Sequence, residues 1–350
     1  MKRHFGLSIP TLGVLVTCLL LNGAFAQENQ KLAQTGFQFL SVVSDARAAA
    51  MGEAMTSLQL GSGALFFNPA GMAGMNGLLD FTASTNQWIA DITHTTFSFA
   101  VNPWHGDYGT LGVSLQHINY GEFLGTRVNS ASPQGYDDTG VFELSSLAIG
   151  LGYAKQLSDR FSVGAHVRWV RQDLGESMTA VNIRTFYPGT DSSYRIADTA
   201  LVENKLTPFV FDFGTQFRTG FKSLVFGMSV RNFSGEMEYA SEGFQAPLVF
   251  TLGISMDVMD LWGGLAPDHS LYCSVDASHH RDHPEQVKIG LEYRLMDLVS
   301  LRAGYASSNN EETDFSYGIG VSKYGFTFDY AYTPFGVFDA VQRMTVRFSY

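Results

Sequence analysis

The sequence predicts an all-β fold: a transmembrane antiparallel β-barrel of about 14 strands, with an N-terminal plug segment inside the lumen. Apolar and polar residues alternate almost everywhere after Leu78, which gives each strand one apolar and one polar face. Beyond the N-terminal segment, no apolar run reaches the length of a membrane helix. The last strand alternates cleanly and ends on Tyr350, an aromatic ending that is usual in bacterial outer-membrane barrels.

Residues 1–26 have the pattern of a secretory signal peptide. Lys2 and Arg3 supply the charged start, 12–21 the apolar run, and 24–26 a small-x-small cleavage site. The apolar run is short for a bilayer span, which needs roughly 20 residues. Cleavage after residue 26 is therefore preferred over an uncleaved anchor helix.

Composition and charge limit the class of function. The formal net charge is −11, and loss of the two basic signal residues would make it −13, which argues against a nucleic-acid partner. Cys273 would be the only cysteine left, so an internal disulfide or a cysteine-based metal site is excluded. Aromatics at 13% and 36 glycines suit a lipid-facing belt around a tightly packed interior of small residues.

Residues 27–77 are predicted to form the plug, or hatch, because their composition is rich in Gly, Ala, Met and Asn and lacks strand alternation. The turn Asn68, Pro69, Ala70 and Gly71 would let the segment double back in a narrow lumen, with the asparagine amide satisfying freed backbone groups. A surface turn before the first strand is the alternative. The apolar residues just before this turn favour the plug, since they are too apolar to be left in water.

Residues 78–350 are predicted to form the barrel. Turn residues bound each alternating segment. Phe348 and Tyr350 in the last segment are predicted to act as the assembly signal. The expected strands lie near 78–88, 92–102, 108–120, 142–155, 160–174, 205–218, 222–233, 245–257, 268–279, 285–296, 298–308, 313–323, 324–334 and 340–350.

The two faces of these segments differ in chemistry. Phe328 and Leu291 belong to the predicted lipid face, whereas the opposite face carries glycines, arginines and carboxylates, as expected for a lumen filled by the chain's own side chains. The long connections 121–141 and 175–204 are predicted to be outer loops and the outward contact surface, because outer-membrane barrels have long outer and short inner connections.

No segment carries a specific catalytic or metal motif. The tract 279–285 holds three histidines, an aspartate and a glutamate, but neighbouring histidines in a turn point apart, so a solvated loop is preferred over a metal site. Ser, His and Asp residues occur on the predicted lumen face, and sequence alone does not show that any three meet. We therefore expect no enzyme, no cofactor and no metal. A barrel hydrolase is the alternative, since outer-membrane barrels can be hydrolases, but its motif is lacking.

Two N-terminal motifs carry a family resemblance. The stretch 45–54, which includes Arg47 and Gly52, and the stretch 68–73 resemble the PorV/PorQ family of outer-membrane proteins, distant relatives of the FadL long-chain fatty-acid transporters. The resemblance implies a fourteen-stranded FadL-like barrel with the N-terminal segment inside, and assigns Arg47, Asn68 and Pro69 to plug docking. Further similar motifs lie at 120–123, 301–305, 329–332 and the final strand.

The resemblance also implies a location and a function. PorV and PorQ proteins serve the type IX secretion system, so the expected role is a non-enzymatic component of protein secretion in the outer membrane. Its expected partners are outer-membrane lipid and secreted proteins or other secretion-system subunits. The alternative is a FadL-like transporter of hydrophobic small molecules, which would need an apolar pocket. The arginine-rich, polar lumen predicted above argues against that alternative.

Overall fold

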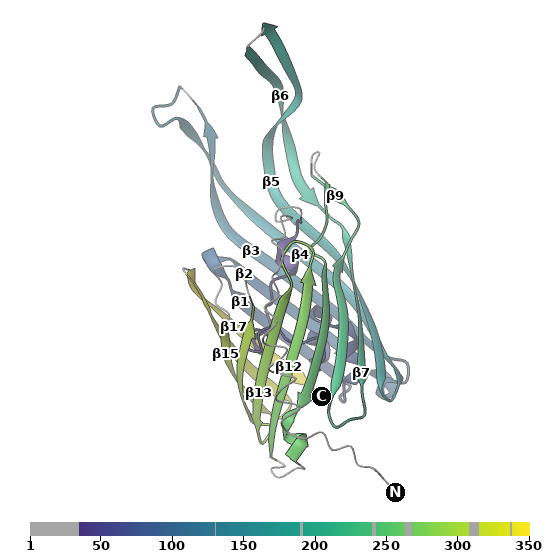
Figure 1. The fold of residues 1–350 in the computed structure, drawn as a ribbon. Helices are drawn as coiled ribbons and strands as arrows, with labels where there is room; N and C mark the ends of the chain where they lie inside the picture. The colour runs from purple at the N-terminus through teal and green to yellow at the C-terminus, as the bar shows by residue number, and fades with distance from the viewer. Residues whose placement is uncertain are drawn as a thin grey trace.

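The structure, a computed structural model, consists of strands with a few short helices (Figure 1). The predicted signal peptide, residues 1–26, lies outside the residues that the structure describes. The described residues are 35–129, 131–189, 192–239, 243–262, 268–307, 315–336 and 338–350.

The elements have the following bounds. The strands are β1 (Leu79–Gln87), β2 (Thr93–Val101), β3 (Thr110–Val128), β4 (Tyr136–Ser158), β5 (Phe161–Gly189), β6 (Ser192–Leu206), β7 (Phe209–Arg218), β8 (Val225–Phe233), β9 (Met237–Glu238), β10 (Gly243–Phe244), β11 (Val249–Asp257), β12 (His269–His280), β13 (Gln286–Leu295), β14 (Val299–Ala306), β15 (Phe315–Lys323), β16 (Phe326–Phe335) and β17 (Phe338–Ser349). The helix is α2 (Ala46–Ala50), and the 3-10 helices are η1 (Gln38–Leu40), η2 (Gly61–Phe66), η3 (Pro69–Gly74), η4 (Ile89–Asp91), η5 (Pro103–Gly106) and η6 (Val258–Trp262).

The barrel is closed and antiparallel, with 14 strands. The first and last strands pair, with Asp80 opposite Ser349, and β4 pairs with β5 to complete the ring. Strands β6 and β7 act as one strand interrupted at Pro208, whose carbonyl still accepts a 2.9 Å hydrogen bond from the amide of Val170 on β5. The predicted all-β barrel is confirmed, and each of the predicted segments coincides with a barrel strand.

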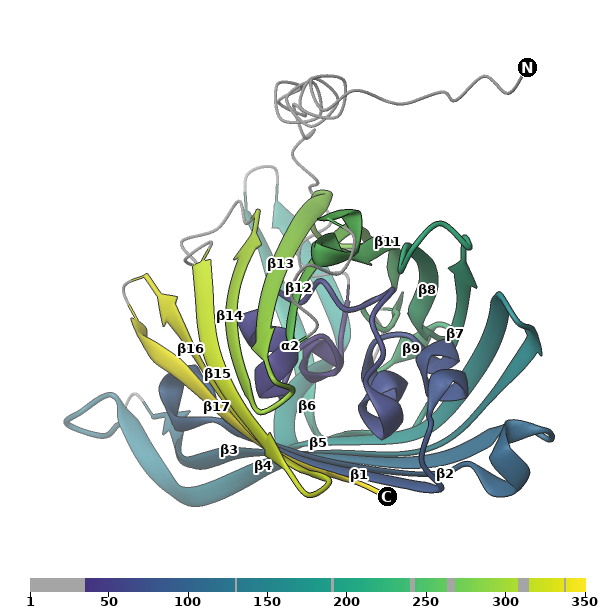
Figure 2. The same cartoon turned by 90° about the horizontal axis from the view of Figure 1, so that it is seen from below.

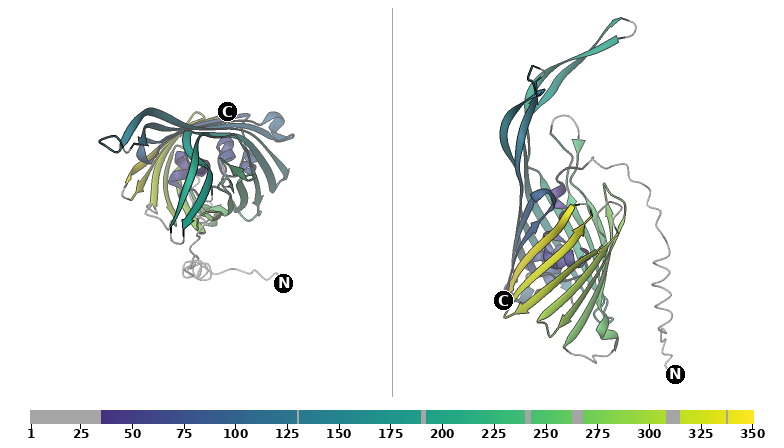
Figure 3. Two further views of the ribbon diagram at one scale, coloured as in Figure 1. Left: turned by 90° about the horizontal axis from the view of Figure 1, so that it is seen from above. Right: turned by 90° about the vertical axis from the view of Figure 1, so that its left-hand side faces the viewer.

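The connections 121–141 and 175–204 differ from the prediction. Instead of loops, they are continuations of strands: β3 and β4 form one long hairpin and β5 and β6 another, and both project far beyond the barrel (Figure 3). In β3 and β4 beyond the barrel, the side chains on both faces are mostly exposed, so alternation in the sequence does not mark these strand extensions. We take the end from which they project as the outer end.

The wall has the two predicted faces. On β13, the side chain of Leu291 points outward and the residue is 44% exposed, whereas the next residue, Glu292, is completely buried on the inside. On β16, Phe328 is 58% exposed and Asp329 is buried. This alternation places an apolar surface toward lipid and a polar, charged surface toward the lumen.

The segment before β1 lies inside the barrel, where the view along the barrel shows it surrounded by strands (Figure 2). We refer to residues 35–77 as the plug. Helix α2 packs against β14 to β17, η2 against β1 to β3, and η3 against β3, β4, β5 and β7. Asp45 caps α2 by accepting a 2.7 Å hydrogen bond from the amide of Ala48. Among the described residues, no helix is long and apolar enough to cross a bilayer.

The plug lies directly against glycines of the wall, which we call the glycine belt. At Gly164, Gly227, Gly290 and Gly304 the nearest plug atoms belong to the backbone, and at the other belt glycines they belong to side chains. A Cβ atom at Gly304 would lie 1.9 Å from the amide nitrogen of Gly52, and one at Gly164 would lie 2.4 Å from that of Ala70. Only residues without a side chain allow such an approach. The glycine belt consists of Gly112, Gly152, Gly164, Gly214, Gly227, Gly253, Gly290, Gly304 and Gly318.

Gly304→Ala should destabilise the folded protein by about 1–3 kcal/mol, because the added methyl group overlaps plug backbone that has no room to retreat. The measurement is the free energy of unfolding in urea, with the protein in liposomes. Gly235→Ala is the matched control, since a Cβ atom there meets open space. Equal stability of the two variants would contradict the tight plug contact.

Candidate functional site

The plug leaves space on both of its sides. A cavity of about 230 Å³ opens toward the outer end between the start of the plug and strands β12 and β13. A second cavity, of about 260 Å³, lies toward the inner end between α2 and strands β13 to β17. The outer cavity is lined by Gln38, Ser41, Val42, Val43, Glu53, Trp88, Arg231, His280, Asp282, His283, Gln286 and Lys288. The inner cavity is lined by Asp45, Arg47, Leu60, Thr82, Arg294, Asp297, Ser300, Arg302, Ser322, Thr327, Asp329, Thr345 and Arg347.

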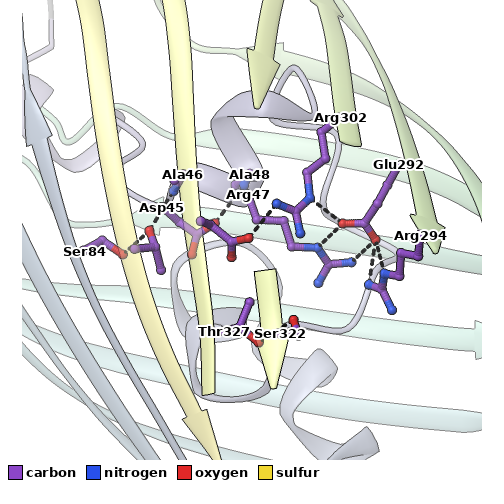
Figure 4. Close-up of polar contacts among 12 residues, drawn as sticks. Asp45, Ala46, Arg47, Ala48, Ser84, Glu292, Arg294, Arg302, Ser322 and Thr327 are labelled. Carbon is purple, nitrogen blue, oxygen red and sulfur yellow. Dashed lines mark hydrogen bonds and ion pairs between the residues drawn. The ribbon is translucent and has the colours of Figure 1, made fainter. Parts of the chain in front are cut away.

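A buried ion network closes the inner cavity on the plug side (Figure 4). The carboxylate of Glu292 accepts hydrogen bonds from Arg47 of the plug at 2.8 and 3.0 Å. It also pairs with Arg302 and Arg294 of the wall, each at 2.6 Å. Arg302 continues to Asp329, again at 2.6 Å. Because Glu292 is completely buried among three arginines, the network fixes the plug to β13 and β14.

The other predicted plug residues lie against the opposite wall. The Asn68 side-chain amide donates to the carbonyls of Thr56 and Thr215 at 2.7 and 3.0 Å, and its oxygen accepts from the amide of Ala70. Pro69 begins η3, where its fixed φ and missing N–H suit the first helical turn. Thus Asn68 connects two parts of the plug to β7.

Two more predicted plug residues have backbone roles. Gly52 has a φ of +59°, and a Cβ atom there would lie 2.7 Å from the carbonyl of Tyr305, so both its conformation and its position on β14 exclude a side chain. Gly71 is buried in η3, where a Cβ atom would lie 3.1 Å from that of Ala64.

The predicted assembly residues lie at the seam between the first and last strands. The ring of Phe348 packs on that of Phe326 with centroids 4.6 Å apart, and Tyr350 exchanges backbone hydrogen bonds with Leu79. The role of Phe348 and Tyr350 as an assembly signal stays a prediction.

An apolar patch, which the sequence analysis missed, lines the outer part of the lumen. Strands β3, β4, β5 and β7 contribute four fully buried apolar side chains, and Phe37, Phe39 and Leu40 at the start of the plug pack against them. The residues of the patch are far apart in the sequence, because each strand contributes only one or two inward-facing residues to it. Its wall residues are Ile118, Ala148, Val170 and Val210, with Ala246 beside them.

Three further lumen residues meet in a way that the sequence could not show. The imidazole of His166 lies 2.8 Å from the hydroxyl of Ser114 and 3.0 Å from the carboxylate of Asp212, which is the contact order of Ser-His-Asp hydrolases. All three are at most 4% exposed, and Asp212 also pairs with Arg168 at 2.7 Å. This burial makes the group a structural network of the wall while the plug is docked.

The turn after β12 gathers candidate metal ligands. His279 and His280 do point apart, as predicted, but the turn brings His283 back toward His280. Ligand atoms of His280, Asp282 and His283 all lie within 4.8 Å of one another. Burial opposes ionisation of Asp282, yet hydrogen bonds from Thr35, Gln38 and His283 outweigh it and hold the pKa of Asp282 below its ordinary value.

Comparisons with known proteins place the fold. No protein-family profile and no curated protein matches the chain in sequence. The fold is similar to that of the toluene transporter TbuX of Ralstonia pickettii, at 13% identity over 91% of this chain and 99% of that one, with a TM-score of 0.57. The fold is also similar to that of the Pseudomonas putida toluene transporter TodX, at 15% identity over 87% of this chain and 98% of that one, with a TM-score of 0.59. A Pseudomonas aeruginosa FadL homologue is similar at 12% identity over 87% of this chain and 98% of that one, with a TM-score of 0.52.

These likenesses agree with the wall chemistry. A closed 14-strand barrel with an apolar outer surface and a charged, plugged lumen is an integral outer-membrane protein, and its architecture is FadL-like. The comparisons support the FadL-like part of the predicted resemblance. The assignment to the PorV/PorQ family stays a prediction.

Proposed function

We propose that the protein is a non-enzymatic outer-membrane transporter of hydrophobic small molecules. The observation that carries this proposal is the apolar patch at the outer part of the lumen, which Phe37, Phe39 and Leu40 of the plug occupy. The proposal is supported by the similar folds of two toluene transporters, each matched over nearly its whole length. We therefore prefer transport to the role in protein secretion that the family resemblance implies.

The apolar patch suggests how cargo is received. A hydrophobic molecule entering from outside would take the place of the two phenylalanine rings against Val170 and Val210. Burying each ring is worth about 1.5–3 kcal/mol, so a cargo of similar apolar area offsets the cost of displacing it. The start of the plug can therefore act as a resident occupant that yields to cargo, while the ion network around Glu292 holds the rest of the plug in place.

The predicted charged lumen does not oppose this mechanism. Around the inner cavity the charges are paired, as in the set of Arg47, Glu292 and Arg302, and at the outer cavity Glu53 pairs with Lys288. Hydrophobic cargo would meet the apolar patch first. Passage beyond it requires the plug to shift, because plug and wall are in direct contact along the glycine belt.

A role in protein secretion is a second candidate, and the β3–β4 hairpin favours it. This hairpin carries exposed apolar side chains well beyond the membrane, a surface suited to protein partners. Its exposed apolar residues are Phe123, Leu124, Val128, Tyr136, Val141 and Phe142. Secreted proteins or secretion-system subunits would be the partners on this proposal.

Uptake and secretion assays on a deletion strain separate the two candidates. We expect slower uptake of labelled toluene or labelled oleate, restored by the wild-type protein, with an unchanged set of secreted proteins. Loss of secreted proteins with normal uptake would reverse the order of the candidates.

Phe39→Ala should speed uptake in the complemented strain, because a smaller occupant leaves the apolar patch more easily. Phe67→Ala is the control: it makes the same truncation in the separate plug cluster that packs around α2 and η2. An equal effect of the two truncations would argue that general loosening of the plug, not the apolar patch, governs uptake.

A further inference from the structure

The turn between β12 and β13 holds three metal-binding side chains at the rim of the outer cavity. All three residues, His280, Asp282 and His283, line that cavity, and their ligand atoms lie within 4.8 Å of one another. The Nε2 atom of His280 is buried and has no hydrogen-bond partner among the described residues. An imidazole nitrogen buried without a partner is costly unless something binds it.

We propose that His280, Asp282 and His283 bind one divalent transition-metal ion of the zinc class. Two imidazoles and a carboxylate are the three-residue ligand set of many open zinc sites, in which water or a substrate takes the fourth position. Here the cavity supplies that fourth position. Small rotations of the two histidine rings would bring the ligand atoms to the separations that a tetrahedral ion requires.

The surroundings of Asp282 support a built site. Its carboxylate is 2% exposed and accepts hydrogen bonds from Thr35 and Gln38 of the plug at 2.5 and 2.7 Å. Its other oxygen lies 2.8 Å from Nδ1 of His283. Outer hydrogen bonds such as those from Thr35 and Gln38 orient ligands in metal sites. Because His283 Nδ1 and Asp282 already face each other, the ion would take the place of the proton that these two groups share.

The cations of the outer cavity are already engaged. The ammonium of Lys288 pairs with Glu53 at 2.8 Å, and Arg231 donates to the carbonyl of Phe66 at 2.7 Å. Neither needs the Asp282 carboxylate. The carboxylate of Asp282 also accepts hydrogen bonds from Thr35 and Gln38 of the plug. A metal ion bound to Asp282 would therefore tie the start of the plug to the wall. The site itself does not depend on what the barrel transports.

The test is zinc binding by the full-length protein, purified without a polyhistidine tag. Equilibrium dialysis against Zn²⁺ followed by elemental analysis should give one ion per wild-type chain. His280→Ala and His283→Ala should each weaken binding by about 10–100-fold or more, the range seen when even outer partners of a metal are removed. His279→Ala is the matched control, because that side chain is 61% exposed and faces Glu285 on the other side of the strand.

Heat-modifiable migration on gels verifies that each variant folds, and His280→Gln replaces His280→Ala if the alanine variant does not. Wild-type protein that retains no stoichiometric zinc would overturn the proposal. So would equal loss of binding in His279→Ala and His280→Ala, since the ion would then not be held inside the turn.

Discussion

Glu292→Gln should lower the free energy of unfolding by about 3–5 kcal/mol, the cost of breaking a buried charge network by removing one partner. The substitution keeps the side-chain shape but leaves Arg47, Arg294 and Arg302 without their shared anion. Because Arg47 belongs to the plug and the other two belong to the wall, the plug should loosen first. Denaturant unfolding in liposomes measures the total loss.

Limited trypsin digestion reports on the plug itself. Arg47 is 8% exposed in α2, so cleavage after it requires the plug to leave the wall. We expect faster cleavage at Arg47 in Glu292→Gln than in the wild type. Glu285→Gln serves as the control on the same strand pair, because its side chain is 63% exposed and its loss should change stability within about 0.5 kcal/mol. Identical digestion in both variants would rule out the proposed lock.

Leu291→Arg, one residue away but on the other face, should cost about 2–4 kcal/mol because it places a charge in the middle of the lipid-facing belt. Leu291 is the sixth residue of the ten-residue strand β13, which puts it near the bilayer midplane. The measurement is again unfolding in liposomes.

Phe328→Arg provides the depth control. Phe328 is the third residue of β16, next to a short inner turn, so the same charge lies closer to water and should cost less, down to about 0–1 kcal/mol near the interface. A cost at Phe328 that exceeds the cost at Leu291 would mean that the membrane is placed wrongly along the barrel. If neither arginine substitution lowered the free energy of unfolding, the assignment of these residues to the lipid-facing side of the wall would be wrong.

The barrel was predictable from sequence because lipid and lumen impose opposite chemistry at every second residue. Leu291 and Glu292 illustrate this, since their types alone assign their faces. The hairpins of β3 to β6 were not predictable as strands. In the β3–β4 hairpin the side chains on both faces are mostly exposed beyond the barrel, so alternation carries no information there.

The candidate sites were largely not predictable. The apolar patch and the contact of Ser114 with His166 each depend on how far neighbouring strands are shifted along one another, and period-two patterns do not specify that shift. In the same way, Arg47 was expected to dock the plug, but its partner Glu292 lies 245 residues away. The approach of His283 to His280 was missed because it depends on the path of one short turn.

The glycine belt also bears on how such barrels can diverge. Along β14, Leu301 and Ala303 face lipid, where one apolar residue can replace another at little cost, while Gly304 touches plug backbone and admits no replacement unless the plug retreats. Adjacent positions of one strand are therefore under very different restrictions. A plug taken from a related barrel would meet a wall shaped for another backbone path, so a change in the path of the plug requires a matching change in the wall.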